Sequence, residues 1–308
     1  MATSRTNIAI DAVRAMIADS TVAFGIPAFN EGDGIVPTLR SLWEGLASLQ
    51  LGRCQLILSE SHTHASLSSA EPAAEWAASV NANLHIDSAN RRRPKKEAVN
   101  GIFDRANSDV LLLMDADVVI PRDSLVTLLY HLFNSPRPVA VLGAALPDPA
   151  ASGWNYRAGA WQLRASTRAT SRTPRVQGVF WGSWRSFYST HRLTVGAGSL
   201  AEDVEIARAL VVGGFPYVNV PEAFVYTVPP GSITDLCLGT IRSEMALSGR
   251  KRERNEYFAA IVEAARDPLG AALYGWVRIW CRHNRSVLLR ESDTEDWQML
   301  KSTKRKNV

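Results

Sequence analysis

The sequence predicts an α/β protein with a mostly parallel sheet, followed by a helical C-terminal extension. Three observations point to this class. Short continuous apolar runs alternate with stretches of helical periodicity through the first half of the chain, as in a sheet covered on both faces. From residue 235 onward the pattern is helical. With 46% hydrophobic and 21% charged residues in 308, the composition is that of an ordinary folded protein.

The elements follow one another with little linker between them. Buried strands are expected at residues 21–27, 55–59, 84–87, 109–114 and 139–146, of which DVLLLM at 109–114 is the strongest. Helices are expected at residues 34–49, 71–80, 95–106 and 123–133. The second half is less regular, with a helix at 202–210, a turn at Gly213-Gly214, a strand at 217–227 and a short amphipathic segment at 268–280. In such sheets ligands bind beyond the carboxyl ends of the strands.

Composition and charge exclude several classes of protein. No stretch longer than 13 residues lacks Asp, Glu, Lys and Arg, whereas a membrane-spanning helix needs about 20 mostly apolar residues. The N-terminus mixes acids and bases, unlike a signal peptide. The cysteines (Cys54, Cys237 and Cys281) are few and have no CxxC spacing, so we expect a reducing, cytoplasmic location.

The positive charge is concentrated at the C-terminal end. Of the net +4, residues 249–308 contribute 13 Lys+Arg against 8 Asp+Glu. A solvated tail is the commoner interpretation, and a basic surface for anionic lipid or nucleic acid is the alternative.

Two acidic pairs carry the candidate chemistry. Asp115 and Asp117 directly follow the strongest strand, where buried carboxylates need a partner. A hard cation, Mg²⁺ or Mn²⁺, with diphosphate oxygens completing its shell is one such partner, and a turn or helix cap is the alternative. Glu202 and Asp203 open a helix, where one carboxylate could act as a general base or both could complement the helix dipole.

A basic run and a strand–helix junction complete the pattern. Residues 91–96 (RRRPKK) lead into a helix and oppose its dipole, so an anion such as a nucleotide diphosphate would fit there, as would a solvated loop. The junction at residues 26–32 (IPAFNEG) lacks both GxGxxG and GxxxxGK[ST], which disfavours NAD, FAD and P-loop binding.

Taken in their order along the chain, the strand–helix junction, the basic run and the two acidic pairs resemble the family 2 glycosyltransferases, which have a GT-A fold. The resemblance covers residues 21–249. The stretches that carry the resemblance are IPAFNEGDGIVPTLRSL, RRPKKEAVNGIFDRANSDVLLLMDADV and GSLAEDVEIARALVVGGFPYVNVPEAFVYT. The resemblance implies a catalytic GT-A domain at 1–248, with a donor-binding half at about 20–147 and an acceptor half at about 148–248. Residues 249–308 form the helical basic extension.

The resemblance also assigns roles to residues. Asp203 takes the position of the catalytic base, beside Glu202, and Asp117 with Asp115 holds Mn²⁺ or Mg²⁺. The nucleotide-sugar donor is expected to contact Pro27, Ala28, Glu31, Glu60, Arg93, Lys95, Asp115 and Arg242. Trp181 and Trp184 are candidates for stacking on the acceptor, with core packing as the alternative.

Departures from the family pattern refine the expected function. Residues 59–64 (SESHTH) replace the usual acidic base-reading motif, so the nucleotide base is open, with a UDP-sugar favoured. Of the QxxRW motif of processive members only Arg242 remains, which favours a single transfer over polymerisation. The resemblance implies that this transfer is inverting, with a glycan, lipid-linked or small-molecule acceptor. Peripheral contact with the inner membrane face is left open, and no nucleic-acid partner is expected.

Two other functions fit the sequence less well. A sugar-1-phosphate nucleotidylyltransferase usually has a basic Gly-rich loop after the first strand, and PAFNEGDG contains no base. The second alternative is a non-enzymatic protein that binds membrane or nucleic acid through its tail. It does not explain why both acidic pairs occur where a transferase needs them.

Overall fold

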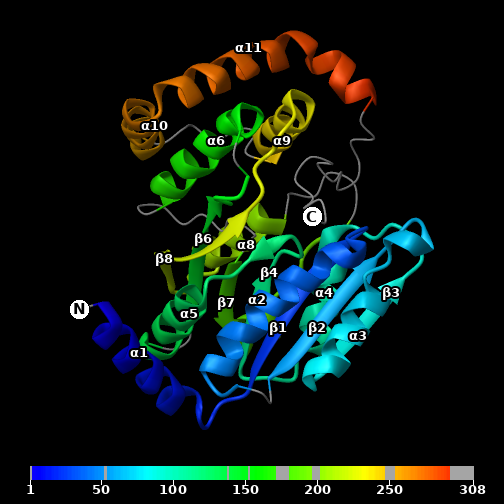
Figure 1. The fold of residues 1–308 in the computed structure, drawn as a ribbon, viewed down its shortest axis with the longest axis vertical. Helices are drawn as coiled ribbons and strands as arrows, with labels where there is room; N and C mark the ends of the chain where they lie inside the picture. Colours follow the sequence, from blue (N-terminus) through cyan, green and yellow to red (C-terminus); the bar gives the residue numbers. More distant parts are fainter. Residues whose placement is uncertain are drawn as a thin grey trace. The chain divides into compact units, whose positions relative to one another are not determined.

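The computed structural model describes residues 2–51, 54–136, 139–151, 153–170, 180–195, 202–246 and 254–291. Figure 1 shows the helices and strands along the chain. The strands are β1 (Val22–Phe29), β2 (Gln55–Ser61), β3 (Leu84–Ala89), β4 (Val110–Met114), β5 (Val118–Val119), β6 (Ala140–Pro147), β7 (Phe180–Trp184) and β8 (Tyr217–Thr227). The helices are α1 (Ala2–Ile17), α2 (Ile35–Ser48), α3 (Ala70–Val80), α4 (Lys95–Arg105), α5 (Arg122–Asn134), α6 (Trp154–Thr170), α7 (Arg185–Tyr188), α8 (Glu202–Val212), α9 (Ile233–Ala246), α10 (Arg254–Arg266) and α11 (Pro268–Glu291).

Within the described residues, the strands form one sheet in the order β3-β2-β1-β4-β7-β6-β8-β5. β1 pairs in parallel with β2 and β4, and β2 pairs in parallel with β3. β7 runs antiparallel to both β4 and β6. The register places Ala28 opposite Glu60, so the carboxyl ends of these two parallel strands share one edge of the sheet. The predicted α/β class is confirmed.

Helices cover both faces of the sheet. One apolar cluster joins the sheet to α1, α2, α3 and α5, and a second joins it to α4, α7 and α8. The buried stripe of α2, which includes Ile35, Leu39, Leu42 and Leu46, has the i, i+4, i+7 spacing of one helix face. At Gly25 of β1 a Cβ atom would lie 2.4 Å from the Ile102 side chain of α4, so glycine is what allows α4 to approach the sheet this closely.

Most predicted elements of the first half are present within two or three residues of their expected ends. The elements that the sequence did not predict include α1, α6 and β7. The amphipathic segment expected at 268–280 is the first half of the 24-residue helix α11. Among the residues described, no helix has both the length and the apolar character that crossing a membrane requires.

The chain divides into two compact units. The first contains residues up to Ala144 and the described residues between 180 and Val225, and it carries most of the sheet. The second contains α6 and the described helices that follow Tyr226. In this second unit α6, α9 and α11 share an apolar cluster that includes Ala158, Cys237 and Val277. The predicted domain boundary at residue 248 stays a prediction.

Candidate active site

Lys95 joins the two acidic pairs that the sequence singles out. Its Nζ atom lies 2.7 Å from Oδ1 of Asp115 and 2.6 Å from Oε1 of Glu202. The lysine comes from the first turn of α4, Asp115 follows β4, and Glu202 opens α8. All three side chains are at least three-quarters buried. Burial alone would lower the pKa of Lys95, but the two carboxylates outweigh it and raise that pKa, so the lysine stays charged.

Asp203 lies next to this cluster with a perturbed carboxyl group. Burial, reinforced by the negative charge of Glu202, raises the pKa of Asp203 to about 6 although Lys95 opposes the shift. Oδ1 of Asp203 accepts a hydrogen bond from the backbone N–H of Val204 at 2.8 Å. A general base works best when its pKa is close to the operating pH, and this carboxyl group approaches that condition.

A side chain of α2 forms hydrogen bonds to the backbone of the loop that carries Asp115 and Asp117. The buried Thr38 hydroxyl lies 2.7 Å from the backbone oxygens of both Ala116 and Val118, the residues that flank Asp117. These contacts fix the backbone at the end of β4 and thereby the position from which the Asp117 side chain starts. Sequence patterns carried no signal for this role of Thr38.

The residues present fit a divalent metal in part. Asp115 and Asp117 carry the carboxylate oxygens that Mg²⁺ and Mn²⁺ prefer. Oδ1 of Asp115 is paired with Lys95 in this structure, and the role of both residues as ligands stays a prediction. Within the described residues, no group of three or more His, Cys, Asp and Glu side chains is placed to hold a metal ion. Two carboxylates leave coordination positions to be filled from outside the chain, and diphosphate oxygens suit those positions.

A second ion pair between α4 and α8 supports the first. Nζ of Lys96 lies 2.9 Å from Oε2 of Glu205 and 3.1 Å from the carbonyl oxygen of Thr194. Glu205 also accepts a hydrogen bond from the Thr194 N–H at 2.6 Å. The Lys95-Lys96 doublet therefore ties the first turn of α4 to the first turn of α8. The bases that oppose the dipole of α4 are thus offset by carboxylates of the chain itself.

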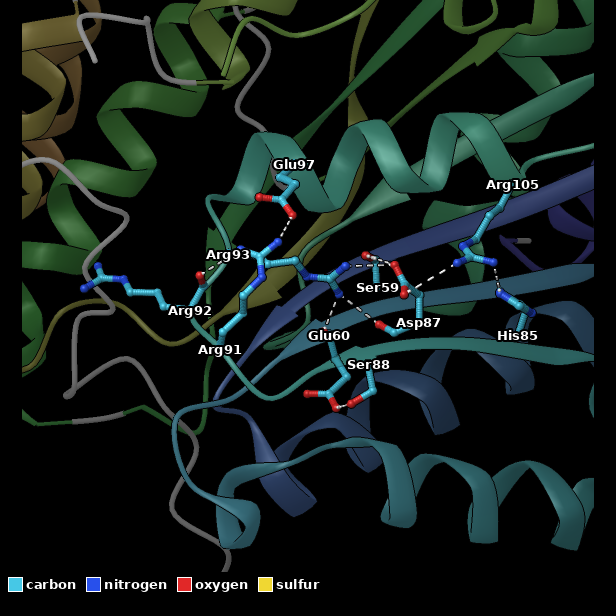
Figure 2. Close-up of polar contacts among 10 residues, drawn as sticks. All are labelled: Ser59, Glu60, His85, Asp87, Ser88, Arg91, Arg92, Arg93, Glu97 and Arg105. Atoms are coloured by element: carbon cyan, nitrogen blue, oxygen red, sulfur yellow. Dashed lines mark hydrogen bonds and ion pairs between the residues drawn. The ribbon is translucent and has the colours of Figure 1, made fainter. Parts of the chain in front are cut away.

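Glu60, predicted to contact the nucleotide base, is fully buried. Its carboxylate accepts hydrogen bonds from the Ser68 hydroxyl at 3.0 Å and from the Ser88 hydroxyl, and it lies 3.2 Å from Nδ1 of His62. Figure 2 shows the contact with Ser88, a residue of the neighbouring strand β3. Contact with a base would require this fully buried carboxylate to become accessible, and the assignment stays a prediction.

Arg93 forms hydrogen bonds to residues near the ends of β2 and β3. Its guanidinium donates to Oδ2 of Asp87 at 2.9 Å and to the carbonyl oxygens of Glu60 and Asp87 at 2.5 and 3.0 Å (Figure 2). Burial alone would raise the pKa of Asp87, but Arg93, together with Arg105, holds it below its usual value. In this structure Arg93 shapes the edge of the sheet where the donor is expected, and its direct contact with the donor stays a prediction.

The junction after β1 is held against the one after β2. Asn30, with a positive φ of 53°, accepts a hydrogen bond through Oδ1 from the Thr63 N–H at 2.9 Å. Pro27 and Ala28 lie at the buried end of β1, and Glu31 is half-buried just beyond it. The three predicted donor contacts therefore share the sheet edge with Glu60, as their strand positions require.

The remaining predicted residues have different outcomes. Trp181 and Trp184 lie in β7 and are 2% and 7% exposed. Trp181 packs edge-on against Phe187, and Nε1 of Trp184 donates to the Leu132 carbonyl at 3.3 Å. These positions favour core packing over stacking on an acceptor. Arg242 lies in α9, but its side chain is outside the described residues, as are the small residues before Glu202 and the basic tail beyond residue 291.

Comparisons with known proteins agree on the fold. The family described as Glycosyl transferase family 2 matches residues 24–190, which is more than half of the chain and ends before Glu202. A mannosyltransferase from Pyrobaculum calidifontis, solved with GDP-Man and Mn²⁺, is similar with a TM-score of 0.57, 17% identity and 93% of both chains covered. Glucosyl-3-phosphoglycerate synthase from Mycobacterium tuberculosis, solved with Mn²⁺, UDP and phosphoglyceric acid, has a TM-score of 0.52 and 18% identity, covering 79% of this chain and 84% of the other. No curated sequence matches significantly.

Proposed function

Because this chain belongs to glycosyl transferase family 2, we propose that it catalyses a divalent-metal-dependent, inverting transfer of one sugar from a nucleoside-diphosphate sugar to an acceptor hydroxyl. The observation that carries the proposal is the convergence of Lys95, Asp115, Glu202 and Asp203 from three separated segments. A buried lysine among carboxylates, beside a carboxyl group with a pKa of about 6, combines charge for an anionic leaving group with a base for a hydroxyl.

Asp203 acts as the base in this proposal. As the acceptor oxygen forms its bond to the anomeric carbon, the hydroxyl proton passes to the Asp203 carboxylate. The bond from the anomeric carbon to the diphosphate oxygen breaks, and the nucleoside diphosphate leaves with its electron pair. One displacement of this kind inverts the anomeric configuration.

The other residues bind and orient. Lys95 fixes Glu202 and Asp115 and adds positive charge on the side where the diphosphate departs. Asp117 and Asp115 would hold Mn²⁺ or Mg²⁺, which when bound offsets the charge of the leaving diphosphate. Arg93 and Glu60 shape the donor end of the sheet, and Arg242 is proposed to help hold the diphosphate.

Donor binding is tested by thermal shift with UDP, GDP, CDP and TDP, each with and without Mn²⁺. UDP is the favoured donor nucleotide, and GDP is the first alternative. We expect one nucleotide to raise the unfolding temperature only with metal, and Asp117→Asn to remove that increment. The matched control is Asp123→Asn, an exposed carboxylate in the first turn of α5. Equal shifts with and without metal would contradict the metal site.

Transfer itself is tested with the donor sugar that the binding panel selects. The anomeric configuration of the product, read by NMR, distinguishes inversion from retention, and the product size distinguishes one transfer from polymerisation. Asp203→Asn should abolish transfer while nucleotide binding persists. Loss of both together would assign Asp203 a structural role instead.

A further inference from the structure

The outer faces of α10 and α11 expose large apolar side chains. On α10 these are Tyr257, Phe258 and Ile261, and on α11 they are Leu269, Trp276 and Ile279. Ile261 and Ile279 are 67% and 65% exposed. Six of the eleven large hydrophobic side chains found exposed among the described residues lie on these two helices. They are therefore concentrated and not scattered singly over the surface.

The opposite faces of both helices are buried against their neighbours. Glu263 of α10 binds Arg164 of α6 at 2.5 Å. Val277 and Cys281 of α11 belong to the cluster shared with α6 and α9. The exposed residues thus lie on the sides turned away from these partners, at the three- and four-residue spacings of a helix face. Each helix therefore has a second apolar stripe, and this one faces outward.

The charge of α10 and α11 limits the kinds of partner that could bind their outer faces. α11 carries four arginines and one glutamate in PLGAALYGWVRIWCRHNRSVLLRE. α10 carries two arginines and two glutamates in RNEYFAAIVEAAR, so the two helices together have an excess of positive charge. Arg266 and Arg282 are exposed at the ends of the stripes. A matching partner must accept apolar and aromatic side chains and carry negative charge. Both requirements are met by the headgroup–acyl boundary of an anionic bilayer.

We propose that the outer surface formed by Tyr257, Phe258 and Ile261 on α10 and Leu269, Trp276 and Ile279 on α11 binds the interface of an anionic lipid membrane. The helices would lie in the plane of the interface. Tryptophan and tyrosine favour this depth, and arginine reaches the lipid phosphates. A second copy of this chain fits less well, because it would bring the same excess of positive charge to the contact. The proposal does not depend on which sugar is transferred.

Co-sedimentation of the full chain with lipid vesicles tests the proposal. We expect binding to vesicles that contain phosphatidylcholine and phosphatidylglycerol, little binding to phosphatidylcholine alone, and weaker binding in high salt. The double variant Trp276→Gln, Ile279→Gln should lower partitioning by about tenfold or more, since two large interfacial side chains are lost. The matched control is Val211→Gln, Val212→Gln, two exposed apolar residues that end α8, and it should bind like the parent chain.

Further measurements separate lipid binding from its alternatives. Circular dichroism and the unfolding temperature report whether the double variant is folded. If it is not, Arg282→Gln tests the charge contribution alone and should weaken binding several-fold. Absence of vesicle binding, or equal loss in the control, overturns the proposal. So does a dimer of the parent chain in sedimentation velocity that the double variant dissociates, because the partner of the surface is then a second copy.

Discussion

Replacing Asp203 with asparagine should stabilise the protein while it removes the proposed base. The fold raises the pKa of this carboxyl group from 3.8 to about 6, a shift of about two units. At 1.36 kcal/mol per unit, ionised Asp203 costs the folded state about 3 kcal/mol at neutral pH. Asparagine loses a favourable charge in the first turn of α8, worth about 0.3–1 kcal/mol. The expected net gain in unfolding free energy is about 2 kcal/mol.

The gain should depend on pH in a defined direction. Below the unfolded pKa the carboxyl group is protonated in both states, and it imposes no penalty. As the pH rises from about 4 to about 6, the unfolded chain releases the proton first, so the parent protein loses stability relative to the variant. Above about pH 6 the penalty is complete. The advantage of Asp203→Asn should therefore be small near about pH 4.5 and full near about pH 7.5.

Urea denaturation of both proteins at these two pH values measures the difference. Asparagine can keep the hydrogen bond that Oδ1 of Asp203 accepts from Val204, so the substitution changes little besides charge. Asp123→Asn, at an exposed first-turn position of α5, should instead destabilise by about 0.5 kcal/mol. A difference between parent and Asp203→Asn that is independent of pH, or a destabilised variant at the higher pH, would refute the electrostatic reasoning.

Three further outcomes follow from the same cluster and from β2. In a pH–rate profile, kcat/KM should rise with pH and level off above about 6 as Asp203 ionises, and a flat profile would exclude it as the base. Lys95→Met should cost about 3–5 kcal/mol, because Asp115 and Glu202 lose their buried partner. Lys95→Arg should cost clearly less in urea denaturation, and equal costs would contradict the ion pairing. Glu60→Gln should lower the unfolding free energy by about 1–3 kcal/mol, because the neutral amide oxygen is a weaker acceptor than Oε1 of the carboxylate for the hydrogen bonds from Ser68 and Ser88. An unchanged urea midpoint would show that the buried carboxylate is not needed as an acceptor.

Periodicity predicted the strands and helices whose pattern is set by burial within one element. The run DVLLLM became β4 because every residue from Val110 to Met114 is buried, and α2 followed from a single apolar stripe. α1 and α6 were missed. Both interleave apolar residues with small, polar and charged ones, so what makes them helical is packing that periodicity cannot report. β7, which also escaped prediction, is specified by its antiparallel partners β4 and β6.

The sequence indicated which residues belong to the candidate site, but it did not indicate which of them contact one another. Asp115 was identified because carboxylates at the end of a buried strand need a partner, and Lys95 and Asp203 were singled out by the resemblance to the family. Their mutual contacts could not be read from spacing, because they depend on how α4 and α8 pack on one face of the sheet. For the same reason no pattern indicated the role of Lys96. For Trp181 and Trp184 the sequence left acceptor stacking and core packing open, and their burial in β7 favours the core.

The electrostatics of the cluster explain why base and metal would be found together. The pKa of Asp203 is raised by burial and by the charges of Glu202 and Asp115, and Lys95 offsets these only in part. The surroundings of the base thus already disfavour further negative charge. A nucleoside diphosphate bound nearby would add to that charge and hold Asp203 in its protonated, inactive form. A divalent cation on the carboxylates after β4 would reverse this effect, so the metal dependence that we propose would follow from the state of the base as much as from the leaving group.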